Sequence, residues 1–370
     1  MSTKDTKTLL YYWLSLARIT PLRMFKLLEI YSIEELFDRL KKDKKIEDLL
    51  GKSCFAKLVE FANLEMLEKR FDSLKELGVD FLPFCSEKFP EKLAQSNVLP
   101  PPGLYYRGDI SLLSPKLNSV AIVGTRRCSH YGKEATYKFS GELVDYGFVV
   151  ISGLATGIDA YAHDACLKAN GKTVAVLGMG HNKFYPLDNL KLYQQICKEG
   201  LVISEYPPES EAARYTFPER NRIVSALSDA VVVIEASGKS GALITASRAI
   251  EQNKDIFALP GNITSPKSLG TNELIKSSGA HLLSCTQDIL KIFDIKNAKN
   301  TKNIVAIQLD IYEQSVYNQL VVHGELPFDK LFELTKLSSG ELNSVLVSLQ
   351  MKDAVISLPN NTYRAAVISN

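Results

Sequence analysis

Short runs of β-branched residues, separated by longer amphipathic segments, fill the middle of the chain and constrain its fold more than any other feature. Such runs, joined by segments of ten or more residues, are typical of a parallel sheet with crossover helices. We therefore predict an α/β domain over residues 119–294. The expected strands are Val120–Val123, Phe148–Ile151, Thr173–Leu177, Leu201–Ser204, Ala230–Ile234 and Ile256–Leu259.

Nearly every predicted strand leads into a loop that contains glycine, serine or proline. The residues concerned are Gly124, Gly153, Gly178, Pro207 and Gly261. In α/β proteins the loops at the carboxyl ends of the strands line the ligand crevice. We therefore expect the functional residues at this edge of the sheet.

The residues before 119 and after 294 show different sequence patterns. Helical periodicity predicts a helical domain over residues 1–80, and the proline- and aromatic-rich residues 81–118 indicate an ordered connector. A Lys/Asn-rich linker at 295–302 precedes a last domain over 303–370. There, three predicted helices and a turn at Pro359-Asn360-Asn361 suggest a winged helix. The helices are expected at about 310–322, 327–336 and 339–350.

Composition limits the kinds of site that the chain can carry. It has 370 residues, with 44 Lys and Arg against 42 Asp and Glu, so its net charge of +2 gives no general attraction for nucleic acid. Six scattered cysteines without a CxxC pair indicate reduced thiols in the cytoplasm and no metal site. No stretch approaches the roughly 18 to 20 apolar residues of a membrane span, so we expect no membrane contact.

The first candidate site is the loop Gly124-Thr125-Arg126-Arg127, between a predicted strand and a helix. Glycine permits a close backbone approach, a helix start offers free N–H groups, and arginine forks hold phosphate oxygens in pairs. The loop therefore predicts a phosphate cradle. The alternative is a tight turn at Gly124 with two solvated arginines.

A second loop of this kind contains Gly153 and Gly157, which together with Thr156 could form another anion-binding nest. Asp159 and His163 follow, four residues apart on one helical face. They could be an acid–base pair, but no nucleophile or further metal ligand lies beside them in the sequence. We favour a structural pair that braces the loop.

Two glycine motifs do not support a nucleotide cofactor. Gly178-Met179-Gly180 follows a strand but lacks the third glycine of the dinucleotide fingerprint. Gly238-Lys239-Ser240 resembles the end of a phosphate-binding P-loop, but Val233 stands where that motif requires a glycine. The sequence predicts no cofactor and no catalytic residue.

Arginine placement is the most informative feature of residues 119–302, where five of the six arginines follow predicted strands. The segment Arg214–Arg222 mixes cations with Phe217 and Asn221, which suits gripping a single-stranded backbone and stacking its bases. The alternative is a helix start at Pro218 with incidental charge. The six arginines are Arg126, Arg127, Arg214, Arg220, Arg222 and Arg248.

Taken together, these segments resemble the DNA-processing protein A family (DprA, also called Smf) from about Phe89 to Leu283. The order and number of the motifs make the resemblance specific. They include Tyr106-Arg107-Gly108-Asp109, Gly124–Gly132, Ser152–His163, Leu177–Gly180, Ser204–Pro207, Phe217–Arg222, Ser240–Ala246, Pro260-Gly261-Asn262 and Gly270–Ile275.

The resemblance implies a Rossmann-like, mostly parallel sheet with an N-terminal domain similar to a sterile-alpha-motif fold and a C-terminal winged helix. It also implies a non-enzymatic, homodimeric protein of natural transformation that binds and protects single-stranded DNA and helps to load the RecA recombinase. The family's Gly-Ser-Arg loop is here Gly124-Thr125-Arg126, and the basic residue three places before its Phe-Pro is Arg214.

The residues expected at the DNA fall into three roles. Arginines hold phosphates, Phe217 stacks a base, and glycines let the backbone approach the strand. The full set is Gly124, Thr125, Arg126, Arg127, Gly153, Gly157, Arg214, Phe217, Arg220, Asn221 and Arg222.

Two further expectations concern the last domain and a rival function. Residues 303–370 carry 4 Lys and Arg against 7 Asp and Glu, so we expect this domain to contact protein rather than DNA. The rival is a Rossmann-like nucleotide hydrolase of the phosphoribohydrolase type. Such enzymes carry Pro-Gly-Gly-x-Gly-Thr-x-x-Glu, whereas Glu235–Gly241 lacks that spacing of the catalytic acid.

Overall fold

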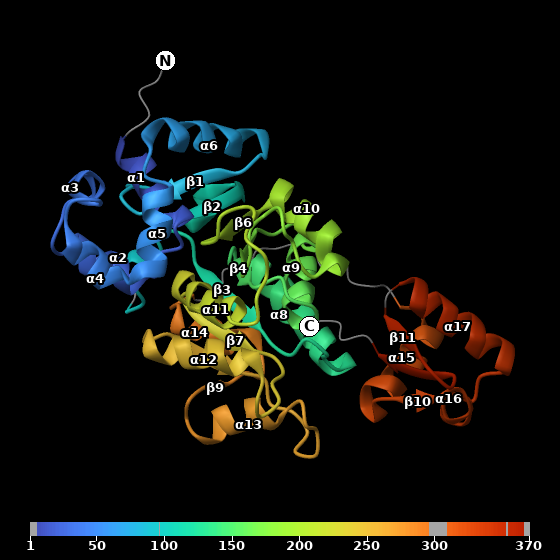
Figure 1. The fold of residues 1–370 in the computed structure, drawn as a ribbon. Helices are drawn as coiled ribbons and strands as arrows, with labels where there is room; N and C mark the ends of the chain where they lie inside the picture. Colours follow the sequence, from blue (N-terminus) through green and yellow to red (C-terminus); the bar gives the residue numbers. More distant parts are fainter. Residues whose placement is uncertain (1–5, 96, 296–308, 353, 366–370) are drawn as a thin grey trace. The chain divides into compact units, whose positions relative to one another are not determined.

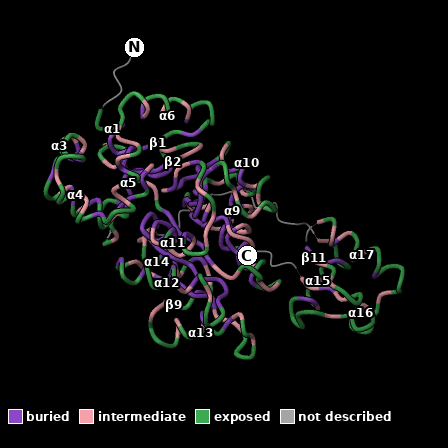
Figure 2. The backbone as a smooth tube through the Cα atoms, in the orientation of Figure 1, coloured by how far each residue is buried: buried purple, intermediate pink, exposed green. Residues whose placement is uncertain are grey.

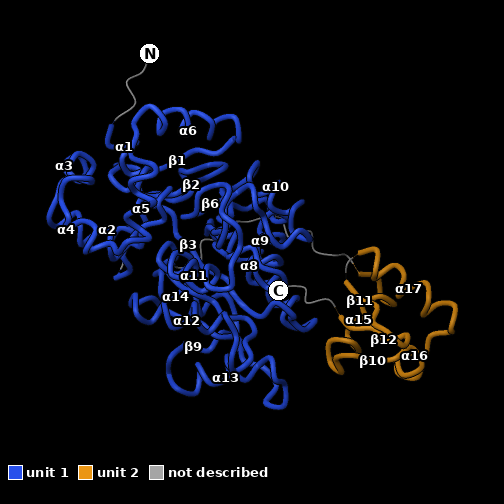
Figure 3. Tube along the Cα trace, viewed as in Figure 1, with its two compact units in different colours: residues 1–298 blue, residues 299–370 orange. Residues whose placement is uncertain are grey.

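A computed structural model of the chain describes residues 6–95, 97–295, 309–352 and 354–365. Its contacts divide the chain into two compact units, Met1–Ala298 and Lys299–Asn370 (Figure 3). The predicted linker 295–302 lies, apart from Ile295, outside the described residues. Among the helices of the described ranges, none has the length and apolar character that a membrane span requires.

A nine-stranded sheet in the order β1-β2-β6-β5-β4-β3-β7-β8-β9 forms the centre of the first unit (Figure 1). The six strands expected from the sequence are confirmed as β3 to β8, with bounds that differ by at most one residue. The strands are β1 (Asp80–Pro83), β2 (Gly103–Gly108), β3 (Ser119–Val123), β4 (Val149–Ser152), β5 (Thr173–Leu177), β6 (Leu201–Ser204), β7 (Ala230–Val233), β8 (Asp255–Ala258) and β9 (His281–Leu282).

Helices cover both faces of this sheet, which explains why its central strands are buried throughout (Figure 2). Ala121 and Val123 of β3 belong to one core cluster, whereas Val120 and Ile122 belong to the cluster on the opposite face. The first cluster includes α7 (Glu91–Ala94), α11 (Thr216–Leu227) and α12 (Gly241–Glu251). The opposite face packs on α8 (His130–Asp145), α9 (Ile158–Lys168), α10 (Leu190–Glu199) and α14 (Thr286–Ile292).

The remaining elements of this part are short. They are α13 (Leu269–Lys276) and the 3₁₀ turns η1 (Ile110–Leu113) and η2 (Leu187–Asn189).

The sequence predicted residues 81–118 only as an ordered connector, and the structure adds two strands to that description. β2 pairs antiparallel with both β1 and β6, so this segment extends the parallel sheet at one edge. Prolines and aromatic residues obscured the two short strands in the sequence.

The expected helices of the N-terminal region are present, and their core continues into the sheet edge. Trp13 is fully buried and donates from Nε1 to the carbonyl oxygen of Leu58 at 2.8 Å. The same apolar cluster includes Phe81 and Tyr105, so helices and sheet edge share one core. The helices are α1 (Thr6–Leu16), α2 (Pro21–Leu28), α3 (Ile33–Arg39), α4 (Lys44–Leu50), α5 (Lys52–Glu60) and α6 (Leu64–Glu76).

The second unit contains the three helices and the hairpin expected from the sequence. Its sheet has the order β10-β12-β11, and the hairpin turn places Asn360 and Asn361 at φ values of 62° and 54°, which asparagine tolerates. The winged-helix assignment stays a prediction. The elements are α15 (Ile311–His323), β10 (Leu326–Pro327), α16 (Phe328–Thr335), α17 (Ser339–Met351), β11 (Val355–Leu358) and β12 (Thr362–Ala365).

Candidate functional site

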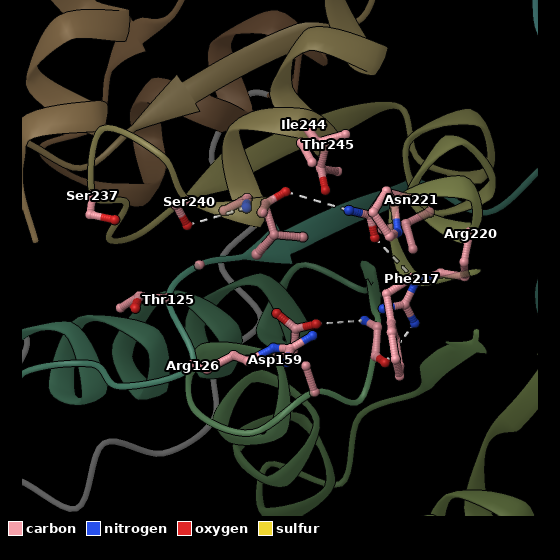
Figure 4. Close-up of a pocket in the computed structure, with 18 of the residues that line it drawn as sticks. Thr125, Arg126, Asp159, Phe217, Arg220, Asn221, Ser237, Ser240, Ile244 and Thr245 are labelled. Carbon is pink, nitrogen blue, oxygen red and sulfur yellow. Dashed lines mark hydrogen bonds between the residues drawn. The ribbon is translucent and has the colours of Figure 1, made fainter. Parts of the chain in front are cut away.

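The strand order places a crevice beside β3. The chain runs from β3 through β4 and β5 to β6 in one direction, and then returns to place β7 on the other side of β3. The loops that leave β3 and β7 therefore diverge, and α/β proteins bind ligands at such a switch point. A pocket of about 430 Å³ lies there, lined by the loops after β3, β4 and β7 and by the first turns of α11 and α12 (Figure 4).

This pocket, which we call the switch-point pocket, brings together nine of the eleven predicted DNA-binding residues. Gly157 and Arg222 do not line it. The nine that do are Gly124, Thr125, Arg126, Arg127, Gly153, Arg214, Phe217, Arg220 and Asn221.

Three arginines give the switch-point pocket its positive charge. Arg126, Arg127 and Arg214 are exposed, and none of them forms an ion pair with any described residue. The Arg126 guanidinium lies 5.4 Å from the centre of the Phe217 ring, over its face. This cation–π contact holds a cation and an aromatic surface side by side, where a phosphate and its base could bind together.

Arg220 differs from these three and corrects the phosphate-holding role predicted for it. It is 4% exposed and donates from Nη1 to the carbonyl oxygens of Gly153, at 2.6 Å, and of Val176. Burial lowers the pKa of Arg220 to about 10, which leaves it charged at neutral pH, and the nearby Asp159 carboxylate opposes that shift. Its guanidinium is therefore held by backbone carbonyl groups and is not free to bind a phosphate.

Asp159 and His163 are both buried but serve different partners. Asp159 accepts from the backbone N–H of Gly153 at 3.2 Å, so it braces the glycine loop as predicted. Burial raises the pKa of Asp159, while the Arg220 charge and then hydrogen bonds from the backbone of Ala155 and Gly153 lower it. His163 instead pairs through Nδ1 with Thr173 Oγ1 at 2.7 Å, and burial lowers its pKa to about 3. The predicted brace is thus Asp159 alone.

Arg222 lies outside the switch-point pocket, which corrects its predicted role there. It forms an ion pair with Glu205 and donates to the carbonyl oxygen of Leu99 at 3.1 Å. Helical geometry explains the difference, because Phe217, Asn221 and Val224 repeat at intervals of four and three residues along α11, and Arg222 falls off that face.

The glycines are required by the packing of the protein itself, and their predicted role of letting the backbone approach DNA stays a prediction. A Cβ atom at Gly124 would collide with the Ile158 side chain, and one at Gly153 with the Arg220 guanidinium. At Gly157 it would meet the carbonyl oxygens of Thr125 and Arg126, and φ there is +80°. These glycines let the two loops pack against each other and so fix the position of Arg126.

We expect Gly157→Ala to destabilise the protein by roughly 1–3 kcal/mol or more without DNA, because the new methyl group adds a collision to left-handed backbone strain. Thermal or chemical unfolding would measure this. Gly141→Ala is the matched control, since a Cβ within α8 there meets nothing within 4 Å. That change should stabilise the protein by about 0.5–1 kcal/mol. Equal stability of the two variants would contradict the packing role of Gly157.

The sequence analysis did not predict the residues after β7 that line the switch-point pocket. Ser237, Ser240 and Thr245 line the switch-point pocket, and Ser240 caps α12 by accepting from the N–H of Ala242 at 3.3 Å. The start of α12 thus presents backbone N–H groups and a positive dipole end to the pocket. The sequence analysis named Ser240 in a failed P-loop match and in a family motif but not as a site residue, although its position after β7, next to β3, indicates the pocket.

The sequence analysis named Glu235 but did not predict its contacts with the arginine loop. It is buried, and its carboxylate accepts from the N–H of Ser129 at 2.8 Å, while its carbonyl oxygen accepts from the N–H of Thr125 at the same distance. Glu235 therefore holds both ends of the arginine loop. The part of the chain that the structure describes contains no group of three or more His, Cys, Asp and Glu residues placed to bind a metal ion.

The fold and the pocket define an α/β protein with an arginine-lined pocket at the switch point of its sheet. A family model described as DNA recombination-mediator protein A matches residues 80–294. The chain belongs to this family, as the sequence motifs had indicated.

Curated relatives match over most of their length. DNA processing protein DprA of Bacillus subtilis (strain 168) is 39% identical over 228 residues, which are 62% of this chain and 76% of that protein. Protein Smf of Synechocystis sp. is 39% identical over 289 residues, 75% of this chain and 71% of that protein.

Two solved structures share the fold. DNA processing protein A of Streptococcus pneumoniae is 34% identical, with a TM-score of 0.66 over 78% of this chain and 99% of that one. The protein from Helicobacter pylori, whose structure addresses its single-stranded DNA binding mode, is also 34% identical, with a TM-score of 0.52 over 58% of this chain and 95% of that one.

Proposed function

We propose that this protein binds single-stranded DNA in the switch-point pocket. The observation that carries the proposal is the group of three exposed arginines, Arg126, Arg127 and Arg214, which have no ion-pair partner among the described residues and line the same pocket as the Phe217 ring. Cations along a backbone path and an aromatic platform for bases are the two requirements of single-strand binding. The Helicobacter pylori relative supports the same function.

A single strand fits the site better than a duplex because the cations lie inside a concavity. The pocket of about 430 Å³ has the size of a small-ligand site, and Phe217 lies within it. A base must leave its stack to reach this ring, which a single strand permits at little cost. We therefore propose weak sequence preference and a strong dependence on salt.

The cellular role is proposed from family membership. As a member of the DNA recombination-mediator family, the protein would act in the cytoplasm during natural transformation, protect incoming strands and help to load the RecA recombinase. We propose that it does so as a homodimer.

We also propose that the protein has no catalytic activity. Asp159, the one acid that lines the switch-point pocket, is engaged with Gly153 and Arg220. His163 is buried and bonded to Thr173, so neither residue is placed to activate a nucleophile. A phosphoribohydrolase-type reaction is the alternative.

The decisive experiment is a binding titration with single-stranded and duplex DNA at two salt concentrations, together with a nucleotide-turnover assay on the same preparation. We expect tighter binding of the single strand, a steep loss of affinity with salt, and no turnover. Preference for duplex DNA would contradict the proposed ligand, and release of a free base from nucleoside monophosphates would support the hydrolase.

A chain that ends at Ala298, the boundary of the first unit, is expected to keep its single-strand affinity within about threefold, or roughly 0.7 kcal/mol. Residues 303–370 carry 4 Lys and Arg against 7 Asp and Glu, and α17 contains neither Lys nor Arg, so this part of the chain offers little attraction for phosphate. Circular dichroism and sizing would first establish that the shortened chain is folded. A much larger loss of affinity would then mean that the second unit contacts DNA.

A further inference from the structure

A second pocket, of about 410 Å³, lies between the helical region and the sheet within the first unit. Its wall is formed by the turn after α1, by α5, by the segment after β6 and by the first turns of α11. We call it the α1–α11 pocket. Of the DNA-binding residues predicted from the sequence, only Arg222 lines it.

Two exposed cations of the helical region line the α1–α11 pocket. Arg18 and Lys57 form no ion pair with the described residues, and the Arg18 guanidinium lies over the Tyr206 ring at 5.2 Å. The other charges of the pocket are engaged, since Glu205 pairs with Arg222 and Glu219 accepts from the Tyr206 hydroxyl at 3.1 Å. The pocket therefore has two cations available for an anion.

Glu205 adds an unsatisfied acceptor to the α1–α11 pocket. Its side chain is nine-tenths buried, and its Oε2 atom pairs with Arg222, but its Oε1 atom is buried without a hydrogen-bond partner among the described residues. A buried acceptor without a partner costs free energy that a ligand N–H would recover. The pocket thus offers sites for an anion and for an N–H donor, which are the two polar ends of a nucleotide.

Helix α11 lies between the two pockets and gives one face to each. Phe217 and Asn221 line the switch-point pocket, whereas Tyr215, Glu219 and Arg222, at intervals of four and three residues, line the α1–α11 pocket. Tyr215 is 58% exposed at the start of the helix, next to Arg214. A strand that leaves the first pocket past Arg214 would meet the Tyr215 ring before it reaches the second.

We propose that the α1–α11 pocket is a second subsite for the same single strand, which rests on the proposed function of the switch-point pocket. Arg18 and Lys57 hold phosphates, Tyr215 stacks a base, and an N–H of a base donates to Glu205 Oε1. The helical region is then part of the DNA-binding surface, and it extends the site beyond the Rossmann-like domain.

The test compares a short and a long oligothymidylate, of about 4 and about 16 nucleotides, because one binding module covers roughly that range. The double variant Arg18→Ala/Lys57→Ala should bind the short strand as the wild type does. Its affinity for the long strand should fall roughly 25-fold at 0.1 M salt, and the salt slope should fall by about 1.4, since each single-strand contact contributes about 0.7. The matched control is Arg39→Ala/Lys41→Ala, which removes the same charge from exposed positions that do not line the pocket.

A probe on the DNA side tests Glu205, because replacing this residue would also release Arg222 from its ion pair. N3-methylthymidine carries a methyl group in place of the base N3 hydrogen, so it cannot donate to Glu205 Oε1. Scanned along the long strand, it should weaken binding of the wild type at one or two positions, and 4-thiothymidine at those positions should cross-link to Tyr215 or its neighbours. No sensitive position, or cross-links to the switch-point pocket alone, would overturn the role of this subsite.

The outcomes separate the two proposals. If the wild type binds no single strand, the proposed function itself fails. If Arg126→Ala weakens binding of both strands but Arg18→Ala/Lys57→Ala weakens neither, only the second subsite fails. If thymidine monophosphate stabilises the wild type but not the Arg18→Ala/Lys57→Ala variant, and strand length has no effect, then the pocket binds free nucleotides and the strand path is wrong.

Discussion

Replacing Arg126 by alanine is expected to weaken single-strand binding about fivefold at 0.1 M salt for every base sequence, because one lost contact lowers the salt slope by about 0.7. Arg126→Ala/Arg214→Ala should lose two such contacts, or roughly 25-fold at 0.1 M salt. Fluorescence anisotropy at three or more salt concentrations measures both the affinity and the slope. The single variant also removes the cation that lies over Phe217, so part of its loss should persist at high salt.

Arg248→Ala is the control for these variants. Arg248 is an exposed arginine that pairs with Glu251 at 2.7 Å on α12, and it does not line the switch-point pocket. It should leave both affinity and slope unchanged. If Arg126→Ala and Arg248→Ala gave the same slope as the wild type, the phosphate-holding role of the arginine loop would be wrong.

The sheet could be predicted because a parallel strand that is buried on both faces consists mainly of apolar residues, which stand out in the sequence. Val120–Val123 and Thr173–Leu177 read as continuous apolar runs, and their carboxyl ends then locate the crevice without further information. β1 and β2 could not be predicted in the same way, since they are edge strands whose pairing depends on a distant partner, β6.

Whether each arginine is exposed or buried was harder to predict, because the sequence shows where a charge lies along the chain but not how far the fold buries it. Arg126 and Arg220 both follow strands and share the same predicted role, yet Arg126 is exposed and Arg220 is 4% exposed. Only the fold brings Gly153 and Val176 to the Arg220 guanidinium. Arg222 is different, since its spacing from Phe217 along α11 already places it on another face.

Replacing Arg220 by methionine is expected to destabilise the protein by about 3–5 kcal/mol at neutral pH, the cost of leaving the buried Asp159 carboxylate without its compensating charge. Methionine is of similar length but carries no charge, so Asp159 would lose the largest charge interaction that lowers its pKa, and the carbonyl oxygens of Gly153 and Val176 would lose their donor. Arg248→Met, at an exposed ion pair, should change the free energy of unfolding by no more than about 1 kcal/mol.

The dependence on pH distinguishes the lost charge pair from lost packing. Burial already raises the pKa of Asp159 above its value in the unfolded chain, and Arg220→Met should raise it further. A carboxyl whose pKa is higher in the folded state binds more protons there, so its destabilising effect grows as pH rises through the folded pKa and fades as pH falls toward about 3.9. The difference in unfolding free energy between wild type and Arg220→Met should therefore shrink in acid, as denaturant unfolding at a series of pH values would measure. Adding Asp159→Asn should recover stability at neutral pH and remove this trend, whereas a difference independent of pH would mean that Arg220 acts through packing alone.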